Sequence, residues 1–368
     1  MEIYLNKRAL VFCVLLLVIL SLLYSTTFHA PFNFDDEVVI KFEVVQKGAH
    51  DWFGKLYPPK YRHLFYSSLI FNYSKGQLNP FGYHLVNTSL HFFTSIVIFF
   101  IAFITIKKGL SLNKKEALSI AGITTLLFSI NPVHSETVNY ISARAVGLSS
   151  FFYLSALLSF ILGSFRERKP LPRFLLYVST LICFLASILS KETALTFPIV
   201  LLLYDVCFMR NDYWAPLKNR LLFFYLPLFL CAILAVLKIL SFKDLIVDFW
   251  QRINVGYGLK QIQIIGHGAR LILLPIGLTF DYDFPNTFFA TNTLLITTFL
   301  FALGIILTIA LYFPKRLMLV SFCFFWFLIT LAPTNSIFPR ADLLSERNLY
   351  LPSFGILFLL AITIHRLV

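Results

Sequence analysis

The chain has few charged residues and no polar segment long enough to form a soluble domain. Only 13% of its 368 residues are charged, against about 25% in an ordinary soluble domain. Hydrophobic residues make up 58% of the chain, and its mean hydropathy is +0.79. A soluble chain of this length has no core large enough to cover so much apolar surface. The composition therefore predicts one membrane domain over residues 1–368.

Cysteine is scarce, and its placement carries no metal or disulfide pattern. None of the cysteines forms a CxxC or CxxH motif, and all lie in or beside apolar runs, so we expect ordinary buried thiols. The five are Cys13, Cys183, Cys207, Cys231 and Cys323.

A cleavage signal is also missing: Lys7 and Arg8 precede an apolar run, but no small-x-small site follows it. We expect an uncleaved first span.

Long apolar runs dominate what is present. A membrane-spanning helix needs about 20 apolar residues, and about ten runs approach that length. They lie near 9–25, 86–106, 117–131, 146–164, 173–190, 194–209, 220–240, 292–313, 316–333 and 350–366. The sequence therefore predicts an all-α, polytopic membrane bundle of about 10–11 transmembrane helices.

The stretch 260–280 is ambiguous because it is apolar but contains polar side chains and glycines. If it spans, Lys315 and Arg316 move to the outer face and break the positive-inside pattern, so a non-spanning segment is favoured. We therefore expect an amphipathic or re-entrant region at 241–291. With the N-terminus inside, the basic clusters on that face are Lys107, Lys108, Lys114 and Lys115, then Arg166, Arg168, Lys169 and Arg173, then Arg210, Lys218 and Arg220. These clusters and anionic lipid account for the net charge of +13 without nucleic acid.

This topology places most acidic residues on the outer face, where the long first loop at 26–84 also lies. The loop opens with Asp35, Asp36 and Glu37, three adjacent carboxylates that repel one another. Such a group fits a cation site, a role in proton transfer, or plain solvation. Arg62 follows later in the loop and could hold a phosphate or lipid headgroups.

Further polar groups lie near the predicted span ends. His84 and His91 belong to a stripe on one helical face, which must meet a cavity or another helix. Pro132 ends or kinks the next span, and His134, Glu136 and Arg144 should then converge at its outer mouth. The other candidates at this surface are Lys191, Glu192, Asp281, Asp283, Glu346 and Arg347. In the favoured topology all of these groups border one cavity.

Ordered motifs along the chain resemble a known family. They are FNFDDEVVI around Asp35, DWFG at 51–54, YRHL at 61–64, NPFGYHLVNTSLH at 79–91, NPVHSETVNYISARA at 131–145, SKETALTFPIVLLLYD at 190–205, LPIGLTFDYDFP at 274–285 and SERNLYLPSFG at 345–355. Together they resemble the transmembrane and tetratricopeptide-repeat O-mannosyltransferases, members of the GT-C class. Asn131, His63, Ala143 and Val146 depart from the family pattern, and the 368 residues contain no tetratricopeptide repeats.

The resemblance implies a membrane glycosyltransferase. Its donor would be a polyprenyl- or dolichyl-phosphate sugar, with mannose expected. Its acceptor would be a hydroxyl at the extracytoplasmic face, expected on protein Ser or Thr, with a lipid or glycan acceptor left open. Asp35 or Asp36 would be the general base. The candidates for holding substrate are Arg62, His84, His91, His134, Glu136, Arg144, Lys191, Glu192, Asp281, Asp283, Glu346 and Arg347. The sequence leaves a divalent metal ion open. The membrane would be the cell membrane in a prokaryote and the endoplasmic reticulum in a eukaryote.

Two other functions remain compatible with the sequence. A transporter or flippase for lipid or glycoconjugate would also need many spans and a polar interior, but it usually carries internal repeats, and none is evident. A non-catalytic subunit of the same fold would keep the helices and lose the chemistry. The adjacent Asp35 and Asp36 argue against that second alternative.

Overall fold

The computed structural model describes residues 7–41, 45–46, 62–167, 169–209, 220–226, 228–230, 233–234, 237, 255–284, 289, 303–304, 315–340 and 342–367. All regular elements in these ranges are helices, so the all-α prediction is confirmed. Among them, three are long and apolar enough to cross a membrane: Pro80–Gly109, Ile141–Gly163 and Pro170–Ser190. The pair Lys114–Ile130 and Pro132–Asn139, bent by 52°, would make a fourth. The chain is a helical membrane protein.

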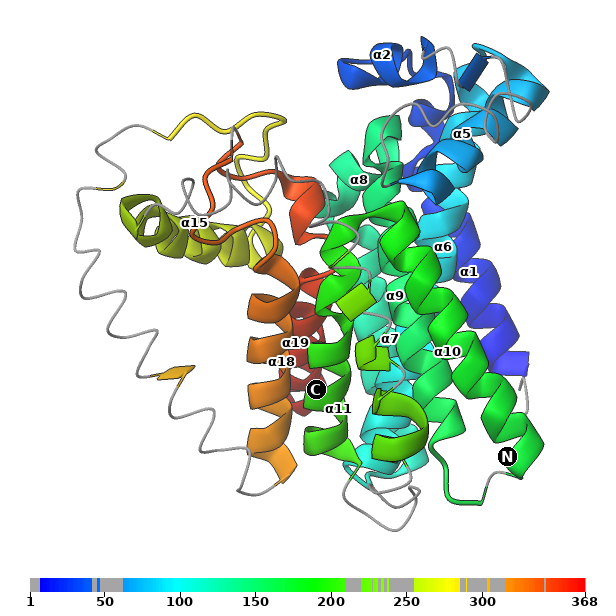
Figure 1. Ribbon diagram of the computed structural model, residues 1–368, viewed down its shortest axis with the longest axis vertical. Helices are drawn as coiled ribbons and strands as arrows, with labels where there is room; N and C mark the ends of the chain where they lie inside the picture. Colours follow the sequence, from blue (N-terminus) through cyan, green and yellow to red (C-terminus); the bar gives the residue numbers. More distant parts are fainter. Residues whose placement is uncertain are drawn as a thin grey trace.

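A bundle of roughly parallel and antiparallel helices forms the body of the molecule (Figure 1). Its long members are α1 (Lys7–Leu23), α6 (Pro80–Ile104), α7 (Lys114–Ile130), α9 (Arg144–Gly163), α10 (Pro170–Ser190), α11 (Phe197–Phe208), α18 (Lys315–Leu331) and α19 (Ser353–Leu367). The π-helical turn η2 (Thr105–Gly109) extends α6. These helices coincide with the spans predicted near 9–25, 86–106, 117–131, 146–164, 173–190, 194–209, 316–333 and 350–366.

Local sequence signals set where these helices begin. Asn79 accepts a hydrogen bond from the backbone N–H of Phe81, and Pro80 occupies the first turn of α6, where its missing N–H costs nothing. Asn113 and Glu116 form a reciprocal capping box at the start of α7. Such caps supply partners for backbone donors that a helix start leaves unpaired.

Small residues let neighbouring helices approach closely. A Cβ on Gly163 would lie 2.9 Å from the Tyr177 ring, so α9 and α10 meet across that glycine. A Cβ on Gly355 would lie 2.6 Å from the carbonyl oxygen of Cys323, which joins α19 to α18. Close backbone approach at small residues is a common way to pack helices in lipid.

The first loop, predicted at 26–84, contains short helices. The turn η1 (Ser25–His29) follows α1, and α2 (Asp35–Lys41) and α5 (His63–Gly76) lie beyond it at the upper end of the bundle (Figure 1). At this end α1, α7, α10 and α18 finish, and α6, α9, α11 and α19 begin. The short elements η3 (Pro132–His134), α8 (Ser135–Asn139), η4 (Ile141–Ala143), η5 (Glu192–Thr196) and η7 (Glu346–Leu349) connect them.

Helix α15 (Val255–Leu273) lies across the bundle direction at the upper end (Figure 1). It packs against the region of η7, where a Cβ on Gly268 would lie 2.9 Å from Leu349. It is not among the described helices long and apolar enough to cross a membrane. The expected non-spanning role of 260–280 stays a prediction.

Several sequence predictions fall outside the described residues. They include DWFG at 51–54, Tyr61 and Cys231, residues 241–254, 285–288 and 290–291 of the region predicted at 241–291, and the span at 292–313 apart from 303–304. The span at 220–240 is described only in part, where the π-helical turn η6 (Leu221–Tyr225) lies.

Candidate active site

The two aspartates at the start of α2 have different surroundings. Asp36 is only 2% exposed, and its carboxylate accepts hydrogen bonds from the backbone N–H groups of Ile141 (3.2 Å) and Ser142 (2.6 Å) and from the Ser142 hydroxyl (2.7 Å). Burial raises the pKa of Asp36, and these hydrogen bonds oppose that effect. Asp35 is exposed. Of the pair, Asp36 anchors α2 to η4, just before α9, and the Asp35 carboxylate remains accessible.

Phe34, just before α2, has a backbone conformation that bulky residues seldom adopt. Its φ is +50°, and its ring is 69% exposed while stacking on Phe280 at 4.3 Å between centroids. Left-handed backbone at a non-glycine residue costs on the order of 1–3 kcal/mol, and such residues cluster at functional sites. The strained residue stands directly beside Asp35.

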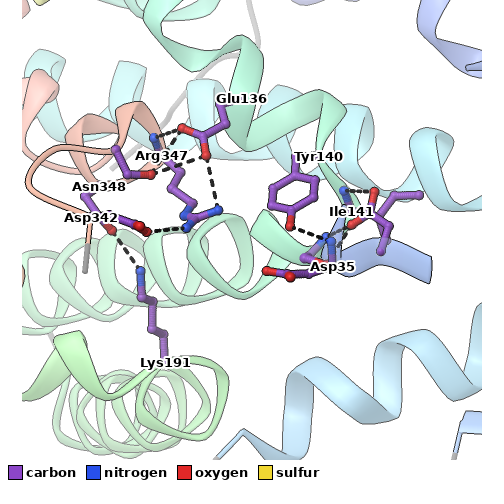
Figure 2. A network of polar contacts seen from close by, with 11 residues as sticks. Asp35, Glu136, Tyr140, Ile141, Lys191, Asp342, Arg347 and Asn348 are labelled. Atoms are coloured by element: carbon purple, nitrogen blue, oxygen red, sulfur yellow. Dashed lines mark hydrogen bonds and ion pairs between the residues drawn. The ribbon is translucent and has the colours of Figure 1, made fainter. Parts of the chain in front are cut away.

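Tyr140 connects the aspartates to the next cluster. Its hydroxyl accepts a hydrogen bond from the backbone N–H of Asp35 at 3.2 Å. Burial, together with the negative charge of Asp35, raises the pKa of Tyr140 to about 12. The guanidinium of Arg347 lies over the other side of the ring, 5.6 Å from its centroid. Figure 2 shows Tyr140 between Asp35 and Arg347.

Glu136 and Arg347 form an ion pair at the centre of this surface. The Arg347 Nη1 atom lies 3.2 Å from Glu136 Oε1, and the backbone N–H of Arg347 donates to Glu136 Oε2 at 2.7 Å. The Ser345 hydroxyl also donates to Glu136, and Asp342 lies 3.4 Å from Arg347 Nη2 (Figure 2). Glu136 therefore fixes the start of η7 as well as its arginine, whose side chain is 23% exposed.

Lys191 reaches the same surface from the end of α10. Its ammonium donates to Asn348 Oδ1 at 3.1 Å, next to Arg347 in sequence (Figure 2). The residue is 7% exposed. Burial, together with the charges of Arg62, Arg340 and Arg347, lowers the pKa of Lys191 to about 7, against the opposite effect of Glu192.

Arg62 and Glu192 pair with each other. Two nitrogens of the Arg62 guanidinium donate to the two Glu192 oxygens, at 3.2 and 2.8 Å. Burial alone would raise the pKa of Glu192, but the hydrogen bonds and charge of Arg62 lower it to about 2. The pair joins α5 to the turn after α10, beside Lys191.

Glu346 holds the segment that follows α15. Its carboxylate accepts from the backbone N–H of Thr279 (2.8 Å) and from the Tyr282 hydroxyl (2.6 Å). Burial raises the pKa of Glu346, against the effect of these two donors. Asp281 and Asp283 flank Tyr282 and are exposed. The predicted groups near 281 and 346 are thus brought together through Tyr282.

The remaining predicted site residues lie inside the bundle. His91 Nε2 donates to the Ser129 carbonyl (3.0 Å), and its Nδ1 shares a hydrogen bond with the Tyr350 hydroxyl (2.7 Å). His134 contacts the Phe128 carbonyl (2.8 Å) and the Ser353 hydroxyl (2.9 Å). The two rings lie 5.8 Å apart. They tie α6, η3 and α19 together below the outer surface.

Arg144 is also buried, with 0% exposure. Its guanidinium donates to Asn87 Oδ1 (2.7 Å), Asn72 Oδ1 (2.6 Å) and the Tyr83 carbonyl (3.0 Å). Beside it lies a cavity of about 10 Å³, enough for about one water molecule. His84, 2% exposed, contacts the Ala30 carbonyl at 3.2 Å through Nε2.

The structure therefore divides the predicted residues into two groups. The outer group lies around the loops at the upper end of the bundle, although four of its members, Asp36, Glu136, Lys191 and Glu346, are buried. It comprises Asp35, Asp36, Arg62, Glu136, Lys191, Glu192, Asp281, Asp283, Glu346 and Arg347. The inner group comprises His84, His91, His134 and Arg144. In the described part of the chain, no three His, Cys, Asp or Glu side chains are grouped closely enough to hold a metal ion.

Known proteins similar to this chain share one description. A mouse protein O-mannosyl-transferase, TMTC3, is 26% identical over 337 residues, covering 82% of this chain and 35% of its own length. A Caenorhabditis elegans protein O-mannosyl-transferase is 27% identical, covering 96% of this chain and 51% of its own length. Mouse TMTC2 is 31% identical over half of this chain and 22% of its own length. The chain is homologous to protein O-mannosyl-transferases. The resemblance seen in the motifs is confirmed.

The chain spans between a third and a half of the length of these first two O-mannosyl-transferase relatives. No family model matches the chain, and no solved structure matches it. The relatives are glycosyltransferases by name.

Sequence analysis did not single out some of the uncharged residues that contact the outer group. Tyr140, Tyr282 and Asn348 each make a polar contact to a predicted site residue but carry no charge at neutral pH. Tyr140 and Asn348 lie within the motifs at 131–145 and 345–355, and Tyr282 lies between two flagged aspartates. Their nearness in sequence to the predicted site residues was the signal that could have identified them.

Proposed function

We propose that this chain transfers mannose from a polyprenyl- or dolichyl-phosphate donor to an acceptor hydroxyl, on protein Ser or Thr, at the extracytoplasmic face. One observation carries the proposal: an exposed carboxylate, Asp35, stands at the same bundle end as Arg347 and the buried Lys191. Tyr140 lies between Asp35 and Arg347. The names of the relatives, protein O-mannosyl-transferases, support mannose transfer as the type of reaction.

The reaction divides between these groups. Asp35 accepts the proton of the acceptor hydroxyl as its oxygen bonds to the anomeric carbon of the sugar. The bond from that carbon to the phosphate oxygen breaks, and its electron pair leaves with the lipid phosphate. Arg347 and Lys191 stabilise the negative charge of that leaving group, since charged donors act strongly where water is excluded.

Asp36 has a different part in this proposal. Its carboxylate already accepts three hydrogen bonds from Ile141 and Ser142, so it positions the start of α2 and with it Asp35. The Arg62–Glu192 pair closes the neighbouring edge of the site and keeps α5 against the α10 turn. Either the cell membrane or the endoplasmic reticulum membrane is compatible with this arrangement.

A transfer assay with matched aspartate variants tests the proposal. Purified chain in detergent is given a panel of radiolabelled polyprenyl-phosphate sugars with peptide acceptors, and products are identified by mass spectrometry. Asp35→Asn should lower the transfer rate by about 10²–10⁴-fold at unchanged thermal stability, because the carboxylate is exposed. Asp36→Asn should lower stability as well, because the amide nitrogen would face backbone N–H groups.

Three results would count against the proposal. Full activity in Asp35→Asn removes the assigned base. Movement of the donor across vesicles without sugar transfer indicates a flippase. Binding of neither donor nor acceptor by folded chain indicates a non-catalytic subunit. Repeating the assay in excess chelator decides whether transfer needs a divalent ion.

A further inference from the structure

The Tyr140 side chain contacts both halves of the proposed site. Its hydroxyl accepts a hydrogen bond from the backbone N–H of Asp35, and the guanidinium of Arg347 lies over its ring. The ring also meets Phe280 edge-on, with centroids 5.1 Å apart. Tyr140 is only 6% exposed, so these contacts fill its surroundings. In Figure 2 the hydroxyl points toward Asp35, and the ring lies between that residue and Arg347.

The backbone of Tyr140 is fixed from both sides. Its N–H donates to the Glu136 carbonyl at 3.0 Å, and its own carbonyl accepts from the Ala143 N–H at 3.1 Å. Glu136 forms the ion pair with Arg347, and the next two residues after Tyr140 hold the carboxylate of Asp36. One short segment, 136–142, therefore contacts the aspartate pair and the arginine together.

Fixed spacing between these groups matters for the chemistry. In an in-line displacement, the base and the charge that stabilises the leaving group act on opposite sides of one carbon atom. A displacement of about 1 Å in such an arrangement can cost on the order of 10²-fold in rate. A cation–π contact restrains an arginine over a ring, and a hydrogen bond to a hydroxyl restrains a backbone N–H. Neither contact neutralises the charge of the arginine or of the aspartate.

We propose that Tyr140 is the positioning residue that sets Asp35 against Arg347. The inference rests on the proposed function and deepens it. The hydroxyl positions the backbone of Asp35, the proposed base, and so affects the rate of the chemical step. The ring places the arginine and so governs affinity for the lipid-phosphate donor. Each part of the side chain has a distinct kinetic consequence.

Two substitutions separate these parts. Tyr140→Phe keeps the ring under Arg347 and against Phe280 but removes the acceptor for the Asp35 N–H. It should lower kcat on the order of tenfold to a hundredfold, with little change in the donor KM. Tyr140→Leu removes ring and hydroxyl. It should lower kcat to a similar extent and also raise the donor KM several-fold.

A matched control comes from the other end of the bundle. The Tyr204 hydroxyl shares a hydrogen bond of 2.7 Å with Thr105 deep in the core. Tyr204→Phe therefore also removes a buried hydroxyl contact, remote from the site, and should leave kcat and KM unchanged. Circular dichroism and thermal unfolding of all three variants show whether each remains folded.

The test combines transfer kinetics with direct binding of polyprenyl phosphate to detergent-purified chain. Weaker binding in Tyr140→Leu than in Tyr140→Phe, with reduced kcat in both, supports the inference. Wild-type kcat in folded Tyr140→Phe, or wild-type binding in folded Tyr140→Leu, overturns it. If the wild-type chain binds polyprenyl phosphate but transfers no sugar, the proposed function fails. The binding comparison then still decides whether Tyr140 places the arginine.

Discussion

Lys191 illustrates how burial can make an ordinary side chain responsive to pH. Its ammonium contacts the neutral Asn348 amide, and the charged groups around it are Arg62, Glu192, Arg340 and Arg347. Burial and the surrounding arginines lower its pKa to about 7. The residue is therefore charged below that pH and loses its proton as the pH rises through it.

Donor affinity should follow that titration. A sugar phosphodiester keeps its single negative charge across this range, so the change comes from the protein. Binding of polyprenyl-phosphate mannose should weaken by up to about tenfold between about pH 6 and about pH 8, as the ammonium disappears. Lys191→Arg, which stays charged, should flatten the dependence, whereas Lys41→Arg at an exposed ion pair should not. Equal pH profiles for wild type and Lys191→Arg would contradict this role.

At the scale of elements, Arg144 joins three helices. It begins α9, and its guanidinium donates to Asn72 on α5 and to Asn87 and the Tyr83 carbonyl on α6. These acceptors are buried, and each would lose a donor if the arginine were removed. An unsatisfied buried polar group costs about 1–3 kcal/mol. The family resemblance had implied a substrate contact for this residue.

Arg144→Ala should therefore destabilise the fold by on the order of 3 kcal/mol and lower the thermal midpoint. Arg144→Lys should retain only part of that stability, because a compact ammonium keeps the charge but cannot reach all three acceptors as a planar guanidinium does. Arg173→Ala, at the opposite end of the bundle, is the matched control, since its guanidinium contacts the carbonyls of Phe165 and Arg166. A stable Arg144→Ala variant with a raised donor KM would instead favour a direct donor contact.

On the scale of the whole molecule, the outer site requires all of its loops on one side of the membrane. The bundle end that holds α2 also holds η7 and the segment after α15 (Figure 1). The described basic residues of the two predicted clusters lie at the other ends of the same helices: Lys107, Lys108, Lys114, Lys115, Arg166, Lys169 and Arg173. The two sets of loops should therefore differ in accessibility.

Single cysteines in a background without native cysteines test this arrangement. Glu37→Cys and Asp283→Cys, both exposed, should react with an impermeant maleimide from the extracytoplasmic side of intact cells. Lys115→Cys and Arg166→Cys should react only after permeabilisation. Labelling of positions 37 and 283 from opposite sides would separate the carboxylate loop from the loop after α15, and the proposed site could not form.

The sequence predicted the described bundle well where apolar length carried the signal. The helices α6, α9 and α10 lie where runs of about 20 apolar residues predicted them. The first loop was less predictable: α2 and α5 are short, and their stability depends on contacts such as Asp36 with Ser142 and Asn72 with Arg144. Short helices gain little from intrinsic propensity, so tertiary contacts decide whether they form.

Residue type and spacing identified the charged members of the candidate site but not their partners. His91, Arg144 and Arg347 are all polar or ionisable residues near predicted span ends. In the structure the first two are enclosed by the core, while the third stays partly exposed. Asp35 and Asp36, adjacent in sequence, differ in the same way. Burial depends on which helices meet, and a single sequence does not specify that.

The sequence by itself determined that lipid is the solvent for this protein, because its apolar runs exceed what a soluble core can cover. It also determined the homology to O-mannosyl-transferases, through motifs in a fixed order. The tertiary structure alone decided which polar groups face outward and which are paired within the bundle. The reason is physical: hydrophobic length is a local property of the chain, whereas hydrogen-bond partners such as Tyr140 and Asp35 lie 105 residues apart and meet only after packing.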